Sequence, residues 1–304
     1  MTALIHSLAP AKIGTTVVPI KSFSLSPAIM SALDHHSGNE YATMVKTSGA
    51  DPRIRLTMPF QPAFDLIGFT VYKATAFEIY MALFTDYARQ AGAVHTKYAL
   101  AASATAAIQM IGVSVDQDGD LMAEVEVIPL ATDSTTHPLL KSNSNSLPTL
   151  AAQPTLHTLG PLSVNGTVYP GLSSAGVDLG QAMDAKRHDG DLYPRIAARL
   201  GGSPRMFGDH ADGSTFAGLT TLLGLNITAN LIQYFRRYDA VTGVCSDAVA
   251  TAVSFTMASS RLQPTDLSVS HLQVSRIGYE AFGLSSTTTH PIAVSVAATV
   301  PAVP

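Results

Sequence analysis

The stretch SGNEYATMVKTSGADPRIRLTMPFQPAFDLIG, Ser37–Gly68, decides how the chain is interpreted, because DGDLYPRIAARLGGSPRMFGD, Asp189–Asp209, echoes it further along. Both stretches begin with a glycine turn and continue with the alternation of apolar and polar residues that is typical of strands. Four residues recur at a spacing of 152: Gly38, Tyr41, Pro52 and Arg53 correspond to Gly190, Tyr193, Pro204 and Arg205. One shared spacing for four residues indicates an internal repeat.

The repeat extends towards both ends of the chain. His6–Pro19 has six matches in His157–Pro170 at a spacing of 151, and Thr135–Pro138 recurs as Thr288–Pro291 at a spacing of 153. The spacing drifts by only two residues, and half of the 304 residues is 152. A tandem duplication of one module is therefore predicted.

The expected boundaries of the modules follow from the repeat and from composition. The first module spans residues 1–140 and the second spans residues 156–304. Residues 141–155 contain KSNSNSLPTLAAQP, Lys141–Pro154, which is rich in Ser, Asn and Pro and lacks apolar periodicity. This composition predicts an extended linker.

Within each module the local pattern is mostly that of strands. Apolar and polar residues alternate in IKSFSLS, Ile20–Ser26, and in LMAEVEVI, Leu121–Ile128. Asn165-Gly166 and Asp118-Gly119-Asp120 are the small polar sequences that form tight turns between paired strands. The unit of strand, turn and strand is therefore expected to dominate both modules.

One segment of each module predicts a helix instead. In AFEIYMALFTDYA, Ala76–Ala88, large apolar residues recur every three or four positions, and LIQYFRRY, Leu231–Tyr238, is its counterpart. The expected fold class is thus α+β, mainly β. It consists of two tandem homologous β-sandwich or barrel modules, each with one amphipathic helix.

The composition excludes several classes of protein. Charged residues are 13% of the chain, with 18 basic against 22 acidic residues and a net charge of -4, which argues against a free nucleic-acid binder. Cys245 is the single cysteine, so no internal disulfide and no zinc site made of several thiolates is expected. The most apolar long window, Tyr98–Val115, is interrupted by polar residues, and the start of the chain has no basic region leading into an apolar one. A soluble chain that is not exported and does not interact with a membrane is expected.

The surface is expected to be covered by other protein molecules. Hydrophobic residues are 46% of the chain and the mean hydropathy is +0.23, which is high for so few charges. A monomer is therefore not expected.

No catalytic, cofactor-binding or metal-binding residue is predicted, and the chain is not expected to be an enzyme. Asp116–Asp120 has its glycine at the fourth position, which is not the spacing of a calcium loop, and Glu124 and Glu126 are interpreted as a solvated strand face. His137 and His290 precede prolines, where a local hydrogen bond is the simplest interpretation. The sequence contains no nucleophile elbow, phosphate-binding loop or dinucleotide fingerprint.

A duplicated β module without a chemical site is best explained by assembly geometry. Rings and shells of identical subunits need heterologous interfaces that close. Fusion of two modules lets three chains present six similar units around one axis. Trimers with pseudo-sixfold symmetry are therefore expected.

The stretch Ser37–Gly68 and its echo Asp189–Asp209 resemble the structural proteins of tailed bacteriophages, most closely the tail-tube and baseplate-hub modules. The likeness lies in the succession of strand, glycine hairpin, strand, short helical turn and helix. It implies a virion protein, assembled in the host cytoplasm, whose rings stack into a tube. The tube would enclose a tape-measure protein and then conduct the phage genome without binding it specifically.

The resemblance also implies which residues make the assembly contacts. We expect the matched turns and hairpins to lie at equivalent positions of the ring and to contact neighbouring subunits or the next ring. These residues are Gly38, Tyr41, Pro52, Arg53, Gly190, Tyr193, Pro204, Arg205, His137 and His290.

Three alternatives remain open from the sequence. A capsid protein of two jelly rolls would also form trimers of pseudo-hexagonal shape. An enzyme would need a site assembled between the modules, and no cluster of acidic or Ser and His residues confined to one module marks one. A carbohydrate-binding module is disfavoured because aromatic residues are only 7% of the chain and tryptophan is absent.

Overall fold

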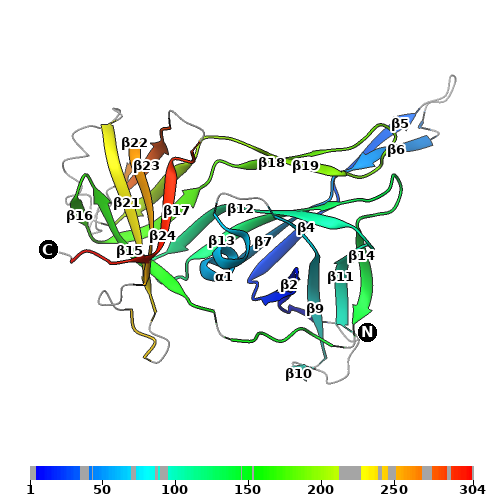
Figure 1. Cartoon of the computed structure of the whole chain (residues 1–304), viewed down its shortest axis with the longest axis horizontal. Helices are drawn as coiled ribbons and strands as arrows, with labels where there is room; N and C mark the ends of the chain where they lie inside the picture. The colour runs from blue at the N-terminus through cyan, green and yellow to red at the C-terminus, as the bar shows by residue number, and fades with distance from the viewer. Residues whose placement is uncertain are drawn as a thin grey trace.

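The computed structural model describes residues 5–34, 41–42, 44–69, 73–85, 88–89, 95–144, 146–152, 154–211, 227–238, 242–245, 251–268, 276–285 and 289–302. Within these residues the chain forms twenty-four strands and one helix, so the prediction of a mainly β protein is confirmed. The first half runs from β1 to β14 and the second half from β15 to β24 (Figure 1).

The elements of the first half are β1 (Ile5–Leu8), β2 (Ala11–Ile13), β3 (Thr16–Val18), β4 (Ser22–Ser26), β5 (Ile29–Asp34), β6 (Met44–Ala50), β7 (Arg53–Pro59), α1 (Phe60–Ile67), β8 (Lys73–Thr75), β9 (Phe77–Thr85), β10 (Ala88–Arg89), β11 (His95–Leu100), β12 (Thr105–Asp116), β13 (Met122–Leu130) and β14 (Leu139–Ser144). Those of the second half are β15 (His157–Val164), β16 (Thr167–Tyr169), β17 (Leu172–Asp178), β18 (Ala182–Lys186), β19 (Ile196–Leu200), β20 (Arg205–His210), β21 (Ile227–Arg237), β22 (Ala252–Ser268), β23 (Arg276–Gly283) and β24 (Ile292–Ala298).

The described strands form two large sheets and two separate hairpins. A seven-stranded sheet has the order β14-β11-β9-β2-β3, with β1 and β10 also paired to β9. A thirteen-stranded sheet has the order β16-β15-β21-β22-β23-β20-β17-β12-β13-β7-β4, with β24 on β22 and β8 on β12. The hairpins are β5–β6 and β18–β19. The larger sheet is continuous through both halves, because β12 pairs with β17 (Figure 1).

The order of strands is the same in the two halves. In the larger sheet, β4-β7-β13-β12 is followed by β17-β20-β23-β22. The smaller sheet, β14-β11-β9-β2-β3, has the order of β24-β22-β21-β15-β16. Strand β22 belongs to both series, since Ala252–Met257 pairs with β24 and Ser260–Ser268 pairs with β23.

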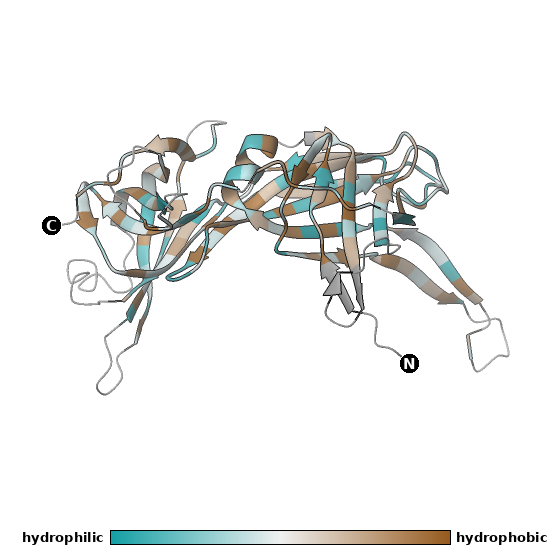
Figure 2. Ribbon diagram, turned by 90° about the horizontal axis from the view of Figure 1, so that it is seen from below, coloured by the Kyte–Doolittle hydropathy of each residue, from teal (hydrophilic) through white to brown (hydrophobic). Residues whose placement is uncertain are grey.

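The core lies between the smaller and larger series of each half and is continuous across the chain. Phe77 of the smaller sheet and Leu56 of the larger sheet are each 1% exposed and belong to one buried cluster, which also contains Phe255 of the second half. The ring centroids of Phe60 and Phe255 lie 5.5 Å apart, edge to face. Hydrophobic and hydrophilic residues alternate along several strands (Figure 2), and in β7 this alternation places one face of the strand in the core.

Helix α1 covers the core face of the larger sheet beside β7, β12 and β13. Phe60, Ala63 and Ile67 are buried, and their spacing of three and four residues places them on one side of the helix. The helix begins after Pro59 and ends at Gly68, whose φ of 82° is accessible to glycine at little cost.

The prediction of amphipathic helices at Ala76–Ala88 and Leu231–Tyr238 was wrong. These segments form β9 and β21, which lie inside their sheets and pair with strands on both sides. In β9 both faces are covered, so Ile79 and Tyr80 are both buried although they point in opposite directions. Apolar residues at odd and even positions together produce a spacing of three and four that imitates a helix.

One other expectation is changed by the structure. Lys141–Ser144, assigned to the linker, belongs to β14 and pairs with β11. Phe216–Gly224, a looser sequence counterpart of the short apolar turn Phe64–Gly68, lies outside the described residues, so that comparison stays a prediction. In the described part of the chain, no helix has the length and apolarity needed to cross a membrane.

Candidate functional site

The two halves are joined by an antiparallel ladder between β12 and β17. Gly112 lies opposite Asp178, and Val113 lies opposite Val177. Both valines are buried, at 3% and 1% exposure. A Cβ atom at Gly112 would lie 3.0 Å from the carbonyl oxygen of Val177, so a larger residue would push the strands apart. This ladder is the internal junction.

Strand β22 has the same construction as β12. The ladder of β12 with β13 shifts register between Met110 and Gly112, and the ladder of β22 with β23 shifts between Pro264 and Asp266. The residue that follows Gly112 is Val113, and the residue that follows Asp266 is Leu267. When the two register shifts are aligned, Leu267 therefore occupies the position that Val113 has in β12.

Strand β4 has the same construction as β17. Val177 lies opposite Met206 in the ladder of β17 with β20, and Leu25 lies opposite Ile54 in the ladder of β4 with β7. The spacing of the sequence repeat relates Leu25 to Val177 and also Ile54 to Met206, so Leu25 occupies the position of Val177. The residues Leu25 and Leu267 are therefore the counterparts of the two valines of the internal junction.

These counterparts lie at the outer edges of the larger sheet. Strand β4 ends the strand order, and beyond Leu262 no described strand lies on the other side of β22 from β23. Leu25 is 38% exposed and Leu267 is 42% exposed. The chain thus has two uncovered edges that carry the pattern of its own internal junction.

The hairpin β18–β19 of the second half packs over the first half. Met183 and Ala197 of the hairpin form a small buried cluster with Ala107, Ile128 and Leu130 of β12 and β13. The loop of the same hairpin also binds the first half, because the Ala131 amide donates to the Pro194 carbonyl oxygen at 2.7 Å.

The hairpin β5–β6 has the same register but lies outside the body of the molecule. Leu33 is opposite Val45, as Ala185 is opposite Ala197, and the spacing of the sequence repeat relates the two pairs. Leu33 is 66% exposed and Val45 is 63% exposed. Figures 1 and 2 both show this hairpin projecting beyond the sheets.

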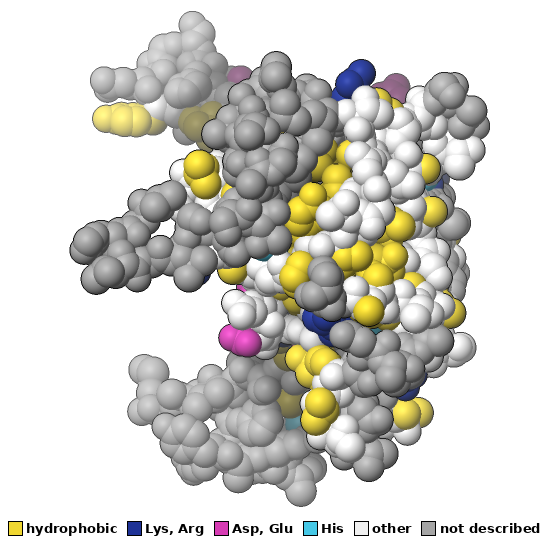
Figure 3. Space-filling view, turned by 90° about the vertical axis from the view of Figure 1, so that its left-hand side faces the viewer, with side chains coloured by type: hydrophobic (Ala, Val, Ile, Leu, Met, Phe, Trp, Pro, Cys, Tyr) yellow, Lys and Arg dark blue, Asp and Glu magenta, His cyan; other side chains and the backbone are white. Residues whose placement is uncertain are grey.

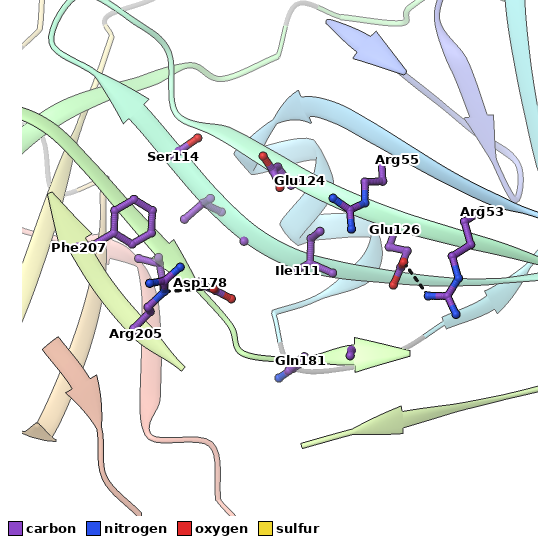
Figure 4. Close-up of a pocket in the computed structure, with 14 residues that line it drawn as sticks. Arg53, Arg55, Ile111, Ser114, Glu124, Glu126, Asp178, Gln181, Arg205 and Phe207 are labelled. Atoms are coloured by element: carbon purple, nitrogen blue, oxygen red, sulfur yellow. Dashed lines mark hydrogen bonds and ion pairs between the residues drawn. The ribbon is translucent and has the colours of Figure 1, made fainter. Parts of the chain in front are cut away.

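Arg53 is held in the junction by three partners. Its Nη1 lies 3.1 Å from Oε1 of Glu126 (Figure 4) and 3.3 Å from the carbonyl oxygen of Met183, and its Nη2 lies 3.0 Å from Oδ2 of Asp51. Burial disfavours the charge of Arg53, but its hydrogen bonds to both carboxylates and their charges outweigh burial and raise its pKa. The contact with Met183 ties the hairpin β18–β19 to the first half.

Arg205 has the matching arrangement in the second half. Its Nη1 lies 2.6 Å from Oε1 of Glu280, and its Nε lies 3.3 Å from Oδ2 of Asp178. The hydrogen bond to Glu280 raises its pKa, and Asp178 adds to the effect. Glu126 lies opposite Arg55, and Glu280 lies opposite Phe207, so the two carboxylates are also matched in register.

A shallow groove of about 370 Å³ runs between these two clusters on the face of the larger sheet opposite the core. The charged residues that line it are three basic and three acidic ones (Figure 4): Arg53, Arg55, Arg205, Glu124, Glu126 and Asp178. Basic and acidic groups alternate here, so the face presents no excess of positive charge. Within the described residues, no group of three or more His, Cys, Asp or Glu side chains is arranged to hold a metal ion.

His137 and His290 make the same local hydrogen bond. The Leu139 amide donates to Nδ1 of His137 at 3.0 Å, and the Ile292 amide donates to Nδ1 of His290 at 3.2 Å. The ring of His137 also contacts the ring of Tyr193, with centroids 4.9 Å apart. His137 of the first half therefore meets a residue of the second half at the internal junction.

The other residues predicted as assembly contacts have different surroundings. Gly190 lies in the turn of the hairpin β18–β19 with a φ of 81°, and Gly38, its counterpart, lies outside the described residues. Tyr41 is 78% exposed, whereas its counterpart Tyr193 contacts His137. Pro52 and Pro204 are buried beside the two arginines. The structure brings Arg53, His137, Tyr193 and Gly190 to the internal junction or to the hairpin that covers it. Arg205 reaches the junction through Asp178, whereas Pro204 and His290 lie within the second half.

Sequence analysis missed the residues that carry the apolar contacts. These are Val113, Val177, Leu25, Leu267, Leu33, Val45, Ile128 and Leu130. The repeat relates the exposed residues of this group to residues at the internal junction. Only the strand pairing shows which member of each pair is covered by another strand or hairpin.

Figure 3 shows the end of the molecule formed by the second half, where apolar side chains are exposed among uncharged polar ones.

No protein-family model and no curated protein matches the chain.

Proposed function

We propose that this chain is a structural subunit of a phage tail tube, built from two homologous modules, residues 1–140 and 156–304. Three chains form a ring of six modules, and the rings stack into a tube that encloses a tape-measure protein and later conducts DNA. The proposal combines the resemblance in Ser37–Gly68 with the repeated strand order.

The observation that carries the proposal is the match between the uncovered edges and the internal junction. A ladder between β22 of one copy and β4 of the next places Asp266 opposite Ser26, Leu267 opposite Leu25 and Ser268 opposite Ser24. This register follows the pairing of β12 with β17, with one difference: Asp266 stands at the position of Gly112, so its Cβ requires the two strands to move apart there by a few tenths of an ångström. The contact is heterologous, because different edges of the same chain meet, and such contacts close into rings or continue as filaments.

Pairing of the edges continues the larger sheet from one copy into the next. The face with Arg53, Glu126, Arg205 and Glu280 then lines the channel. Its two matched arginines are bound to carboxylates at 2.6 to 3.3 Å, so they add little attraction for phosphates. A wall of this kind lets DNA slide without holding it.

The alternative of a capsid protein made of two jelly rolls is less well supported. In that arrangement each module would keep its own sheets, whereas here the larger sheet is shared by both halves through β12 and β17.

The decisive experiment is the assembly state of the purified protein. Mass photometry and negative-stain microscopy are expected to give trimeric rings and stacked rings. Leu267→Asp places a charge in the apolar pair of the new ladder and is expected to release monomers with an unchanged circular dichroism spectrum. The matched control is Val296→Asp, a residue of β24 that is 36% exposed and takes no part in the ladder.

Each outcome decides between the candidates. Closed shells would favour the capsid alternative, and monomers of the unmodified protein at every concentration would contradict both. Rings that survive Leu267→Asp would contradict the proposed ladder.

A further inference from the structure

The hairpin β5–β6 carries the most exposed pair of large apolar residues that face each other in the described structure, Leu33 and Val45. We infer that this hairpin docks on the second half of a neighbouring copy, over Phe282 and Leu284. The inference rests on the proposed ring and adds to it a second contact, separate from the ladder of β22 with β4.

The internal junction provides the template for this contact. There, Ala185 and Ala197 of β18–β19 face Ile128 and Leu130 of the first half. Leu33 and Val45 occupy the positions of these alanines, with the same pairing across the hairpin. At these two positions the docked hairpin β18–β19 has alanines, and the exposed hairpin β5–β6 has the larger leucine and valine.

The receiving surface is found by the same correspondence. Ala107 lies opposite Ile128 in the first half, and Arg261 lies opposite Phe282 in the second half. The alignment of the two register shifts relates these pairs to each other and also relates Leu130 to Leu284, which is 46% exposed. An apolar surface is therefore present where the template requires one.

The third position of the surface differs between the halves. Ala107 corresponds to Arg261, whose Nη1 donates to Oγ1 of Thr228 at 2.9 Å. This hydrogen bond holds the guanidinium over β21, so that the aliphatic part of the side chain remains as a contact surface beside Phe282.

A polar contact of the template is also repeated. Nη1 of Arg53 donates to the carbonyl oxygen of Met183 in the docked hairpin. By register, Arg205 corresponds to Arg53, and Ser31 of β5 corresponds to Met183. Arg205 of one copy is thus placed to donate to the carbonyl oxygen of Ser31 of the next.

The occupant is a second copy because the contact is continuous with the ladder. Strand β5 begins three residues after β4 ends, and β23, which carries Phe282, pairs with β22. When β22 pairs with β4 of the next copy, the hairpin of that copy is brought over β23. In the internal junction, β18 likewise follows β17 and lies over β13.

A disulfide cross-link tests the contact directly. Val45→Cys with Leu284→Cys, in a Cys245→Ser background, is expected to give covalent dimers and trimers on a non-reducing gel after mild oxidation. The matched control is Ile196→Cys with Leu284→Cys, because Ile196 lies on the hairpin that is already docked and is 50% exposed. The control pair is expected to stay monomeric on the gel.

A second variant measures the energetic contribution. Leu33→Asp with Val45→Asp is expected to weaken trimer formation by at least ~100-fold, because two large apolar side chains no longer leave water. Its monomer is expected to unfold at the same urea concentration as a Leu267→Asp monomer.

Failure of this inference is distinguishable from failure of the proposed function. Rings that form normally from the double-aspartate variant, or rings without the Val45 to Leu284 cross-link, overturn the docking and leave the ring intact. Absence of rings from the unmodified protein overturns the ring itself.

Discussion

The hairpins β5–β6 and β18–β19 have the same register and opposite surroundings. Ala185 and Ala197 of β18–β19 pack against the first half, whereas Leu33 and Val45 at the same positions of β5–β6 are more than half exposed. The strand pairing recurs in the two hairpins, but the contact that the hairpin makes does not. Among the described residues, β18–β19 packs on β12 and β13, and no equivalent surface covers Leu33 and Val45.

The same contrast holds at the sheet edges. The valines of the internal junction are at most 3% exposed, and the matching leucines are at least 38% exposed. These exposed apolar residues at matched positions are the basis of the proposal that a second copy completes the contact. Each matched pair thus has one residue that is buried inside the monomer and one that is exposed at its surface.

The largest effect is expected at the surfaces that receive the hairpins. Ile128→Asp places a charge in a fully buried cluster and is expected to destabilise the monomer by about 4 kcal/mol or more. Leu284→Asp, at the matching position, is expected to change monomer stability by less than about 0.5 kcal/mol. Urea denaturation of both variants in a Leu267→Asp background, which keeps the protein monomeric, measures the difference.

Equal destabilisation by the two substitutions would mean that Leu284 already has a partner within its own chain. The comparison between the hairpins would then fail. The variant Val296→Asp serves as the control for an exposed apolar residue without a matched buried one.

Much of the fold follows from particular residues of the sequence. Asn165 and Gly166 adopt positive φ angles of 50° and 87° in the turn between β15 and β16, as the turn chemistry requires. The alternation in Leu121–Ile128 predicted β13. The helix predicted at Ala76–Ala88 failed because a strand covered on both faces loses the alternation that would identify it.

The candidate site was harder to predict for a physical reason. Arg53 and Arg205 were found because they are identical residues at one spacing. Leu33 and Val45 correspond to alanines, so identity alone does not pair them. Whether these positions are buried or exposed depends on which strands lie beside them. The sequence pattern does not show which strands form the edges of a sheet.

The second-largest effect on stability is expected at His157, in the strand β15 that begins the second half. His157 is buried at the start of β15, and its backbone oxygen accepts a hydrogen bond from Leu121 of the first half. Burial, with a smaller contribution from the charge of Arg237, lowers the pKa of His157 to about 4, although a hydrogen bond to the Thr251 backbone opposes the shift. The folded chain therefore binds fewer protons than the unfolded chain between pH 6.5 and about 4.

The free energy of unfolding is expected to fall by up to about 3 kcal/mol as the pH falls through this window. Above pH 6.5 this loss is absent, because His157 is neutral in both the folded and the unfolded chain. His157→Gln is expected to remove this part of the pH dependence. The measurement is the free energy of unfolding from pH 7 to pH 4 for both proteins. An unchanged slope in the variant would show that other groups cause the acid sensitivity.

A smaller effect is expected at the matched carboxylates. Glu126→Gln removes a charged partner of Arg53 beneath the docked hairpin and is expected to cost about 1–2 kcal/mol. Glu280→Gln is expected to cost less than about 1 kcal/mol, because Arg205 and Glu280 are both more exposed than Arg53 and Glu126, while each arginine retains an aspartate partner. Thermal denaturation of the monomeric variants measures the contrast, and a larger cost for Glu280→Gln would reverse it.

The smallest effect distinguishes the two tyrosines. Tyr193→Ala removes the ring contact with His137 and is expected to destabilise the monomer by about 1 kcal/mol. Tyr41→Ala removes an aromatic side chain of a residue that is 78% exposed, so the monomer is expected to keep its stability. The trimeric assembly is expected to dissociate more readily. The two measurements separate an internal contact from its external copy, since one is read from unfolding and the other from assembly. If Tyr41→Ala lowered the free energy of unfolding and left assembly unchanged, Tyr41 would make its contacts within its own monomer. The correspondence between the internal junction and the proposed contact between copies would then not include Tyr41 and Tyr193.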